Sequence, residues 1–261
     1  MENKISVVIN TYNANLYLRQ VLEAVGDFDE VVVCDMESTD DTMVTARDFG
    51  CRCVTFPREQ HTIVEPARNF AVAQAQYDWV LVVDADEIVT PQLRSYLYKR
   101  IAEGNCPAGL MIPRRNKFIG AFTEKNGSDH QLRFFRKQGL FWPEEIHAVP
   151  HVDGPVEKIP VNGDNIQFIH LADETMAENF EKYNRYTSYE LQKRQDRHYG
   201  VGALVGRPLW RFFRSYVLKG GVMRGRRGLL HAMMTGVYQF MLVAKKMEQD
   251  IRHDEDGTPD N

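Results

Sequence analysis

Residues 79–87 read Trp-Val-Leu-Val-Val-Asp-Ala-Asp-Glu, an apolar run that ends abruptly in carboxylates. The apolar part predicts a strand buried in a sheet. Carboxylates packed this closely raise one another's pKa unless a cation lies among them or they are open to water. Alternate residues of a strand share a face, so Asp84 and Asp86 point the same way. We therefore expect them to hold a hard divalent cation, Mg²⁺ or Mn²⁺, with substrate phosphates completing its shell.

A second interpretation of the same carboxylates involves no ligand. A helix is predicted to begin near Thr90-Pro91, because proline is favoured in the first turn of a helix. An Asp or Glu just before it would serve as an N-terminal cap in a solvated turn.

The first hundred residues alternate between strand and helix patterns. Strands are predicted at 5–10, 30–35, 51–56 and 79–84, and helices at 16–25, 40–49 and 66–76. This alternation predicts an α/β fold with a mostly parallel sheet flanked by helices. The loops after the first two strands contain neither Gly-x-Gly-x-x-Gly nor Gly-Lys-Ser/Thr, which argues against dehydrogenases and P-loop ATPases.

The rest of the chain has a different organisation. After Gly104, short strands and loops are predicted, followed by a long polar helix at 174–197 and two helices near 208–219 and 228–248. We expect residues 1–104 to bind the nucleotide and 105–198 the acceptor, together forming one domain, 1–198. The same patterns predict a basic amphipathic helical extension at 199–248 and an acidic disordered tail at 249–261.

Composition excludes several classes of protein. The chain has 261 residues, 43% of them hydrophobic, and a net charge of −4, so the charge of the whole chain does not favour nucleic acid as a partner. Its four cysteines show no Cys-x-x-Cys spacing, which argues against a zinc site or a disulfide framework. The apolar stretch 229–244 is too short and too polar to span a bilayer. With no secretory signal evident, we expect a cytoplasmic protein.

Two further polar groups follow the first strands, where open α/β sheets bind ligands. Thr11 and Asn13 lie in Asn-Thr-Tyr-Asn after the first strand, and Asp35 and Ser38 lie at the end of the second. Asp35 could accept hydrogen bonds from a uracil or a ribose. Ser38 and the adjacent Asp40 could instead cap the next helix.

These motifs occur in a specific order. Asn-Thr-Tyr-Asn at 10–13, Val-Val-Val-Cys-Asp with Ser-Thr-Asp-Asp-Thr at 31–42, Arg-Asn-Phe-Ala at 68–71 and Asp-Ala-Asp-Glu at 84–87 resemble glycosyltransferase family 2. Within it, Gln-Leu-Arg-Phe-Phe-Arg at 131–136, Ile-His at 146–147 and the arginine-rich carboxyl end resemble bacterial lipopolysaccharide-core glucosyltransferases. The resemblance covers residues 4–245 and implies a GT-A fold and inverting transfer from a nucleotide sugar.

The resemblance also implies roles for particular residues. Asp86 is the stronger metal ligand, Asp84 is the second, and His170 is a third candidate whose alternative is a hydrogen-bonded core histidine. Arg68 matches a basic position that touches the donor, although it could also be a surface cation. The implied nucleotide-sugar contacts are Thr11, Asn13, Asp35, Ser38, Arg68, Asp84, Ala85 and Asp86.

Inverting transfer needs a base that takes the proton of the acceptor hydroxyl. Asp129 is the candidate, because it precedes Gln-Leu-Arg where the relatives carry an acidic base; stabilising a Gly-Ser turn is its alternative role. Glu144 and Glu145 are the second candidates for this base. The expected acceptor contacts are Arg133, Trp142, Glu145 and His147, although Ala148 replaces the acid that follows this histidine in the relatives and Trp142 could simply pack in the core.

The carboxyl end is basic and amphipathic. No Asp or Glu occurs between Tyr199 and Met247, while arginines and aromatic residues alternate near 207–217. Residues 207–247 could therefore contact an anionic membrane at the inner face of the cytoplasmic membrane. Packing on the catalytic domain is the alternative.

Together these observations predict an enzyme, a metal-dependent inverting glycosyltransferase. The expected donor is a nucleotide diphosphate hexose, UDP-glucose by resemblance, and the expected acceptor is a lipopolysaccharide core or another cell-surface glycan. Two alternatives remain: a sugar-1-phosphate nucleotidyltransferase, or a non-catalytic nucleotide-sugar-binding protein of the same fold.

Overall fold

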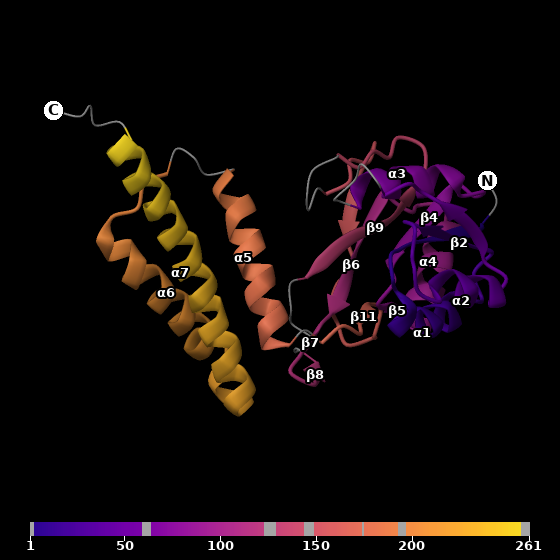
Figure 1. The fold of residues 1–261 in the computed structure, drawn as a ribbon. Coiled ribbons are helices and arrows are strands. Elements are labelled where there is room, and N and C mark those ends of the chain that lie inside the picture. The colour runs from indigo at the N-terminus through magenta and orange to yellow at the C-terminus, as the bar shows by residue number, and fades with distance from the viewer. Residues whose placement is uncertain are drawn as a thin grey trace. The chain divides into compact units, whose positions relative to one another are not determined.

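The computed structural model describes residues 3–58, 64–122, 129–143, 149–173, 175–192 and 197–256, with side chains described as far as residue 253. The chain divides into two compact units (Figure 1). Unit 1 comprises Met1–Lys117 and Phe122–Ala172, and unit 2 comprises Phe118–Ala121 and Asp173–Asn261. The predicted boundary at residue 198 therefore differs from this division, which assigns the long polar helix to unit 2.

Unit 1 begins with the predicted alternation of strands and helices. Its first elements are β1 (Ile5–Thr11), α1 (Asn15–Val25), β2 (Glu30–Asp35), α2 (Thr42–Asp48), β3 (Arg52–Thr55), α3 (Glu65–Gln74), β4 (Trp79–Asp84), β5 (Glu87–Val89) and α4 (Pro91–Ala102). Strands follow as β6 (Gly109–Arg115), β7 (Lys117–Phe118), β8 (Ala121–Phe122), β9 (His130–Arg136), β10 (Val156–Lys158) and β11 (Phe168–His170).

Among the described residues, nine strands form one mixed sheet in the order β3-β2-β1-β4-β9-β6-β11-β5, with β10 paired to β6. The strands β1, β2, β3 and β4 are parallel, whereas β9 runs antiparallel to both β4 and β6. β7 and β8 pair separately. Because β1, β2 and β4 are parallel neighbours, their carboxyl ends meet at one edge of the sheet.

Alternating apolar residues on each strand build one core on each face of the sheet. Ile5, Val7 and Ile9 of β1 join the face covered by α1 and α4, while Val8 joins the face covered by α3. The strand β4 is buried on both faces from Trp79 to Val83. A strand with no exposed face explains why its sequence is a continuous apolar run.

The carboxylates at 84–87 do not cap the next helix. Thr90 is the N-cap of α4, where its hydroxyl accepts a hydrogen bond from the backbone nitrogen of Leu93 at 3.2 Å. Glu87 instead begins β5, which pairs with β11. The capping interpretation is therefore wrong, because a strand lies between the carboxylates and the helix.

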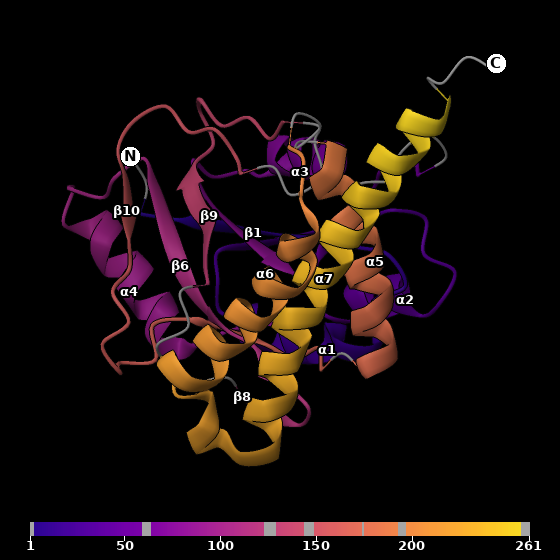
Figure 2. The same ribbon diagram turned by 90° about the vertical axis from the view of Figure 1, so that its left-hand side faces the viewer.

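Unit 2 is helical in the part of the chain that the structure describes. It contains α5 (Met176–Gln192), α6 (Val201–Phe213), a π-helical turn (Arg214–Leu218), a 3₁₀ turn (Gly221–Arg224) and α7 (Gly225–Asp256). α7 contacts both α5 and α6, and α6 and α7 form an antiparallel hairpin (Figure 2). Within the described ranges, no helix is both long enough and apolar enough to cross a membrane.

Two of the predicted helix boundaries in unit 2 are wrong. α6 begins at Val201 and contains Pro208, because packing against α7 overrides the local preference for proline in a first turn. α7 continues to Asp256, into the segment predicted to be a disordered tail. Ion pairs one turn apart, Lys246–Asp250 at 2.7 Å and Glu248–Arg252 at 2.7 Å, support this extension.

Candidate active site

The first polar cluster lies where β1 and β2 end side by side. Parallel pairing sets Thr11 opposite Asp35, and Thr11 Oγ1 donates to Asp35 Oδ1 at 3.0 Å. Ser38 donates to the same carboxylate from its backbone nitrogen, at 2.9 Å, and from its hydroxyl, at 2.5 Å. Thr11 and Asp35 are buried. The carboxylate joins the two strand ends, and three hydrogen bonds leave part of its acceptor capacity unused.

Asn13 shapes the loop beside this carboxylate. Its backbone is left-handed, with φ of 48°, a conformation that asparagine tolerates better than most residues. Its backbone nitrogen donates to Ser38 Oγ at 2.8 Å, and its side-chain oxygen accepts from the backbone nitrogen of Thr39 at 2.8 Å. Asp40 accepts hydrogen bonds from both the backbone and the hydroxyl of Thr42 at the start of α2. The N-cap residue of α2 is Asp41, whose side chain makes no capping hydrogen bond. The expectation that Ser38 or Asp40 caps this helix is therefore wrong: Asp40 contacts Thr42, and Ser38 contacts Asp35.

Asp84, at the end of β4, lies between two arginines. Arg68 of α3 donates to Asp84 Oδ1 at 2.7 Å, and Arg133 of β9 donates to Oδ2 at 2.7 Å. Both guanidinium side chains are about nine-tenths covered, and that of Asp84 is 27% exposed. Arg68 is therefore not a surface cation. Within this group of three side chains, two cations face one carboxylate.

Trp142 lies beneath these arginines. Its ring centroid lies 5.1 Å from Arg68 Cζ and 5.8 Å from Arg133 Cζ. Its backbone exchanges two hydrogen bonds of 2.8 Å with the side chain of Asn69. With a relative exposure of 2%, Trp142 packs in the core as its alternative role foresaw, and it presents no open ring face to a sugar.

Asp86 and His170 meet through strand pairing. β5 and β11 run antiparallel with Glu87 opposite His170, and the backbone nitrogen of Leu171 donates to the Asp86 carbonyl at 2.7 Å. His170 Nε2 then lies 3.1 Å from Asp86 Oδ2. Burial opposes charge on both groups, but their mutual hydrogen bond and attraction prevail, lowering the pKa of Asp86 and raising that of His170.

Arg114 joins this strand end to the predicted base. Its Nη1 donates to Glu87 Oε1 at 3.0 Å, and its Nε donates to Asp129 Oδ2 at 2.9 Å. Glu87 is fully buried, and its other oxygen accepts from the backbone nitrogen of Asp84 at 3.1 Å. Burial and the charge of Asp84 raise the pKa of Glu87 to about 7 in spite of Arg114. Glu87 had no separate role among the predictions, and Arg114, which lies near the end of β6, was not predicted as a site residue.

Asp129 is held by donors on both oxygens. Besides Arg114, Asn116 donates to Oδ2 at 2.8 Å and Gln131 donates to Oδ1 at 2.7 Å. Burial raises the pKa of Asp129, but the charge of Arg114 and these hydrogen bonds outweigh it and bring the pKa below its usual 3.8. The group is therefore ionised at neutral pH. Its side chain remains 31% exposed.

The donor set of this region suits a metal ion that shares its shell with a ligand. Among the described residues, no three His, Cys, Asp or Glu side chains form a group that could hold a metal ion. Asp86 and His170 offer two suitable donor groups 3.1 Å apart. Both oxygens of Asp84 already accept from guanidinium groups. The residues fit a site in which phosphate and water oxygens complete the shell.

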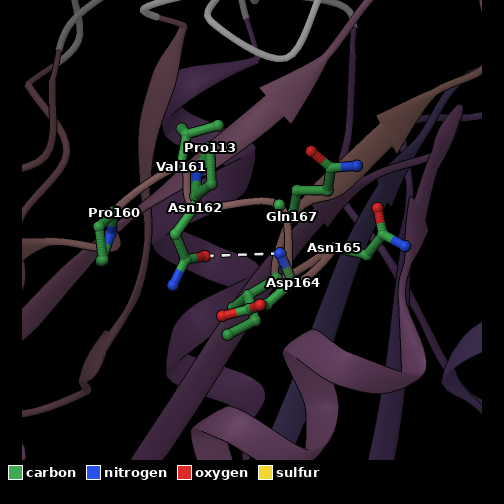
Figure 3. Close-up of a pocket in the computed structure, with 9 residues that line it drawn as sticks. Pro113, Pro160, Val161, Asn162, Asp164, Asn165 and Gln167 are labelled. Atoms are coloured by element: carbon green, nitrogen blue, oxygen red, sulfur yellow. Dashed lines mark hydrogen bonds between the residues drawn. The ribbon is translucent and has the colours of Figure 1, made fainter.

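Three predicted side chains lie outside the described residues: Glu144, Glu145 and His147. A pocket shown in Figure 3 is lined by Pro113 and residues 160–167, and its lining includes none of the predicted site residues. The candidate site therefore rests on the clustered side chains at the strand ends and not on that pocket.

Comparisons with known proteins identify the family and the fold of the chain. The model of glycosyl transferase family 2 matches residues 6–154. An uncharacterised glycosyltransferase of Rickettsia typhi is 22% identical over 267 residues, covering 95% of this chain and 88% of the relative. One from Rickettsia felis is 23% identical over 272 residues, covering 95% and 91%. The crystal structure of S. aureus TarS, residues 1–349, is 18% identical, with a TM-score of 0.51 over 95% of this chain and 92% of that one. This likeness confirms the predicted GT-A fold.

Proposed function

The chain belongs to glycosyl transferase family 2, and from that membership we propose that it transfers a hexose with inversion from a nucleotide diphosphate sugar to a glycan acceptor. The observation that carries the proposal is that three polar groups lie at or next to strand ends of one sheet in unit 1. These are the Asp35 cluster, the Asp84 carboxylate with its two arginines, and the Asp86–His170 pair. β1, β2 and β4 are adjacent in that sheet, and β5 directly follows β4 in the chain.

The first group would bind the nucleoside. Asp35 keeps acceptor capacity for a uracil N–H or a ribose hydroxyl, and Thr11, Asn13 and Ser38 hold the carboxylate and its loop in place. A nucleoside in this position would lie over the carboxyl ends of β1 and β2, where open α/β sheets bind ligands.

The diphosphate would lie at the end of β4. Arg68 and Arg133 carry one more positive charge than Asp84 neutralises, and guanidinium groups match phosphate oxygens well. We therefore propose that Arg133 contacts the donor, although it was predicted to contact the acceptor. Its contact with Asp84 and its burial beside Trp142 support the change.

Asp86 and His170 would hold a divalent metal ion together with the donor phosphates. Ala85, whose side chain packs against the core, would contact the donor through its backbone. When bound, the metal supplies Lewis-acid stabilisation of the charge that develops on the leaving nucleoside diphosphate. His170 requires its neutral form to act as a ligand, so metal binding would release the proton that Asp86 otherwise favours.

Asp129 would orient the acceptor hydroxyl and receive its proton. Its lowered pKa keeps it ionised but makes it a weak base, so proton transfer is favourable only late, when bonding to the sugar has made the hydroxyl acidic. Arg114 and Asn116 hold Asp129 Oδ2, and Gln131 donates to Oδ1. These contacts fix the carboxylate in one orientation.

The finer assignments follow the resemblance of residues 131–136 and 146–147. We propose UDP-glucose as the donor and a lipopolysaccharide core or another cell-surface glycan as the acceptor. A lipid-linked acceptor would place the enzyme at the inner face of the cytoplasmic membrane, with residues 207–247 against it. No observation favours a sugar-1-phosphate nucleotidyltransferase or a non-catalytic binding protein over this assignment.

The proposal is tested by calorimetric titration of UDP, GDP and their hexose conjugates, with Mn²⁺ or Mg²⁺ and then with EDTA. We expect metal-dependent binding of the uridine compounds to the wild-type protein. Asp35→Ala should weaken nucleotide binding, because it removes an acceptor and the anchor of the loop. Glu103→Gln is the matched control, since Glu103 is exposed and forms an ion pair with Lys99 at 3.9 Å, away from the strand ends.

Two results would contradict the proposal. Failure of the wild-type protein to bind any nucleotide sugar would remove the donor site. Binding that is equal in Asp35→Ala, Asp86→Ala and wild type would place the donor elsewhere.

A further inference from the structure

Helix α6 carries apolar side chains on its exposed face. Val201, Val205, Leu209 and Phe213 follow one another at intervals of four residues, and Val217 of the π-helical turn continues the series. All are exposed, from 74% at Val201 to 44% at Phe213. Side chains four residues apart lie one above another on a helix. They form a continuous stripe, and Trp210 is exposed beside it.

The opposite face of α6 packs on α7. The carbonyl oxygen of Pro208 and Cβ of Phe212 lie close to Gly236 of α7, and Thr235 Oγ1 donates to the carbonyl oxygen of Arg211. None of the residues of α6 is buried. In the part of unit 2 that the structure describes, α6 packs mainly on α7, and its apolar stripe remains exposed.

The turn between α6 and α7 extends the stripe. Leu218, Val222 and Met223 are exposed there, Met223 at 88%. We call the exposed apolar residues of α6 together with these three the apolar strip. Apolar side chains gathered in this way mark an interaction site more often than an ordinary surface.

Exposed cations are interleaved with the apolar strip in the sequence. Arg211, Arg214, Lys219, Arg224 and Arg226 are exposed, and no Asp or Glu occurs anywhere between Tyr199 and Met247. Their field is felt by His231 of α7: burial lowers its pKa, and Arg224 and Lys219 lower it further. The apolar strip therefore lies in a region of positive potential.

We propose that the apolar strip binds the surface of an anionic lipid bilayer, with its apolar side chains at the acyl boundary and its cations among the headgroups. A helix with apolar and cationic side chains on one surface lies in the membrane interface in this way. A second copy of the chain is a poorer occupant, because it would bring the same cations together. This proposal gives a surface to the membrane contact of the proposed function and rests on that function only for the lipid-linked acceptor.

The shape of the turn supports a preformed surface. A Cβ on Gly228 would overlap the carbonyl oxygen of Gly221, and one on Gly221 would stand 2.8 Å from the carbonyl oxygen of Ser215. These close approaches hold the start of α7 against the end of α6. Leu218, Val222 and Met223 are thus presented by a compact turn.

The test is cosedimentation of the full chain with vesicles of phosphatidylcholine alone or of phosphatidylcholine with one-quarter phosphatidylglycerol. We expect the wild-type protein to bind the anionic vesicles and to lose binding as the salt concentration rises. Leu209→Asp with Met223→Asp should lower the partition coefficient at least tenfold, because each removes an apolar side chain that the bilayer would bury. Arg211→Gln with Arg214→Gln should lower it about fivefold per cation.

Val44→Asp is the matched control, since Val44 is an exposed apolar residue of α2 in unit 1, and it should bind as wild type does. Circular dichroism identifies any variant that fails to fold, and the arginine pair then decides the outcome.

Equal binding of wild type and both variant pairs would overturn the proposal, as would absence of binding to anionic vesicles. A wild-type dimer that the Asp variants convert to monomers, without vesicle binding, would assign the strip to a second copy. Because no donor or acceptor is present, failure here is separable from failure of the proposed transfer.

Discussion

Units 1 and 2 differ in which of their side chains, charged or apolar, are covered and which are exposed. At the strand ends of unit 1, charged groups are covered and matched: Asp84 accepts from two arginines, and Glu87 is buried against Arg114. Around α6 in unit 2, apolar side chains are exposed and cations stand without nearby acidic residues in the sequence. Covered charge costs free energy unless it is paired, and exposed apolar surface costs free energy unless it is later buried. The difference indicates a site formed within unit 1 and a surface on unit 2 suited to an external partner.

The largest effect is expected when a proposed metal donor of unit 1 is removed, which tests whether the covered charges of this unit form a site. Asp86→Asn is expected to lower the transfer rate at least a thousandfold, because the developing charge on the diphosphate would lose its stabilisation. The measurement is product formation with each candidate donor, together with calorimetric binding of UDP with and without Mn²⁺. Metal-dependent binding that survives unchanged in Asp86→Asn would mean that the covered charges of unit 1 serve the fold alone.

Asp129→Asn separates catalysis from donor binding. We expect transfer to fall by about 10² to 10⁴, the usual contribution of a general base, while affinity for the donor changes less than threefold. Asparagine can still accept from Arg114 and Asn116 through its oxygen, and the Gln131 amide can turn so that its oxygen accepts from the new amide nitrogen. The local structure should therefore be retained. Steady-state kinetics and donor titration of the same preparation provide the comparison. A variant with the wild-type rate would leave Asp129 as a support for its loop.

Asp84→Asn tests whether the paired charges of unit 1 are important for stability. It would leave Arg68 and Arg133 covered beside an uncharged amide, at an expected cost of about 3 kcal/mol in the free energy of unfolding. Denaturant titration measures the change. In the control, Lys99→Gln, an exposed ion pair is lost and about 0.5 kcal/mol or less is expected. Similar effects in both variants would remove the distinction between covered and exposed charge.

Gly228→Ala tests the packing of unit 2. The added methyl group would overlap the carbonyl oxygen of Gly221 and should lower the free energy of unfolding by about 1 to 3 kcal/mol. Gly206→Ala in α6 is the control, because its Cβ would meet open space. There, the helix propensity of alanine should raise stability by up to about 1 kcal/mol. Thermal unfolding followed by circular dichroism distinguishes the two. Equal stability of Gly228→Ala and wild type would show that the turn can rearrange freely.

The smallest expected effect concerns pH. The pKa of Asp129 is lowered below 3.8, so the carboxylate is ionised throughout pH 5 to 8 and gives the rate no acid limb there. The stability of the fold depends on this carboxylate in the same direction. The ionised group stabilises the folded state at pH values above its unfolded pKa, and this stabilisation is lost as the pH falls through its folded pKa. The pH profile of transfer, compared with that of Arg114→Gln, checks this expectation. An acid limb with a midpoint above 5 that disappears in Asp129→Asn would contradict the lowered pKa.

Much of unit 1 could be predicted from local patterns. The apolar runs at 5–10, 30–35 and 79–84 gave strands because burial on both faces requires continuous apolar residues. The polar residues that follow these runs marked one edge of the sheet, since parallel strands end together. Arg114 and Glu87 were less visible, because an ion pair between residues on different strands leaves no spacing in the sequence.

Unit 2 was harder to predict. The helical pattern around Pro208 suggested a helix start, but packing on α7 placed Pro208 inside α6. The acidic composition of the last residues suggested disorder, although ion pairs at intervals of four residues carry α7 to Asp256. In both cases, contacts along or between helices outweighed the propensity of single residues.

Periodicity and composition are local properties of a sequence. They were therefore enough to predict the strands of the first half, the polar residues at the ends of these strands and the excess of cations near the carboxyl end. Tertiary structure alone decided that His170 meets Asp86, that Arg68 and Arg133 converge on Asp84, and that Arg114 joins Glu87 to Asp129. It also decided which face of α6 is covered by α7. The physical reason is that charge pairing and burial act through distances in space, and those distances exist only once the strands and helices have packed.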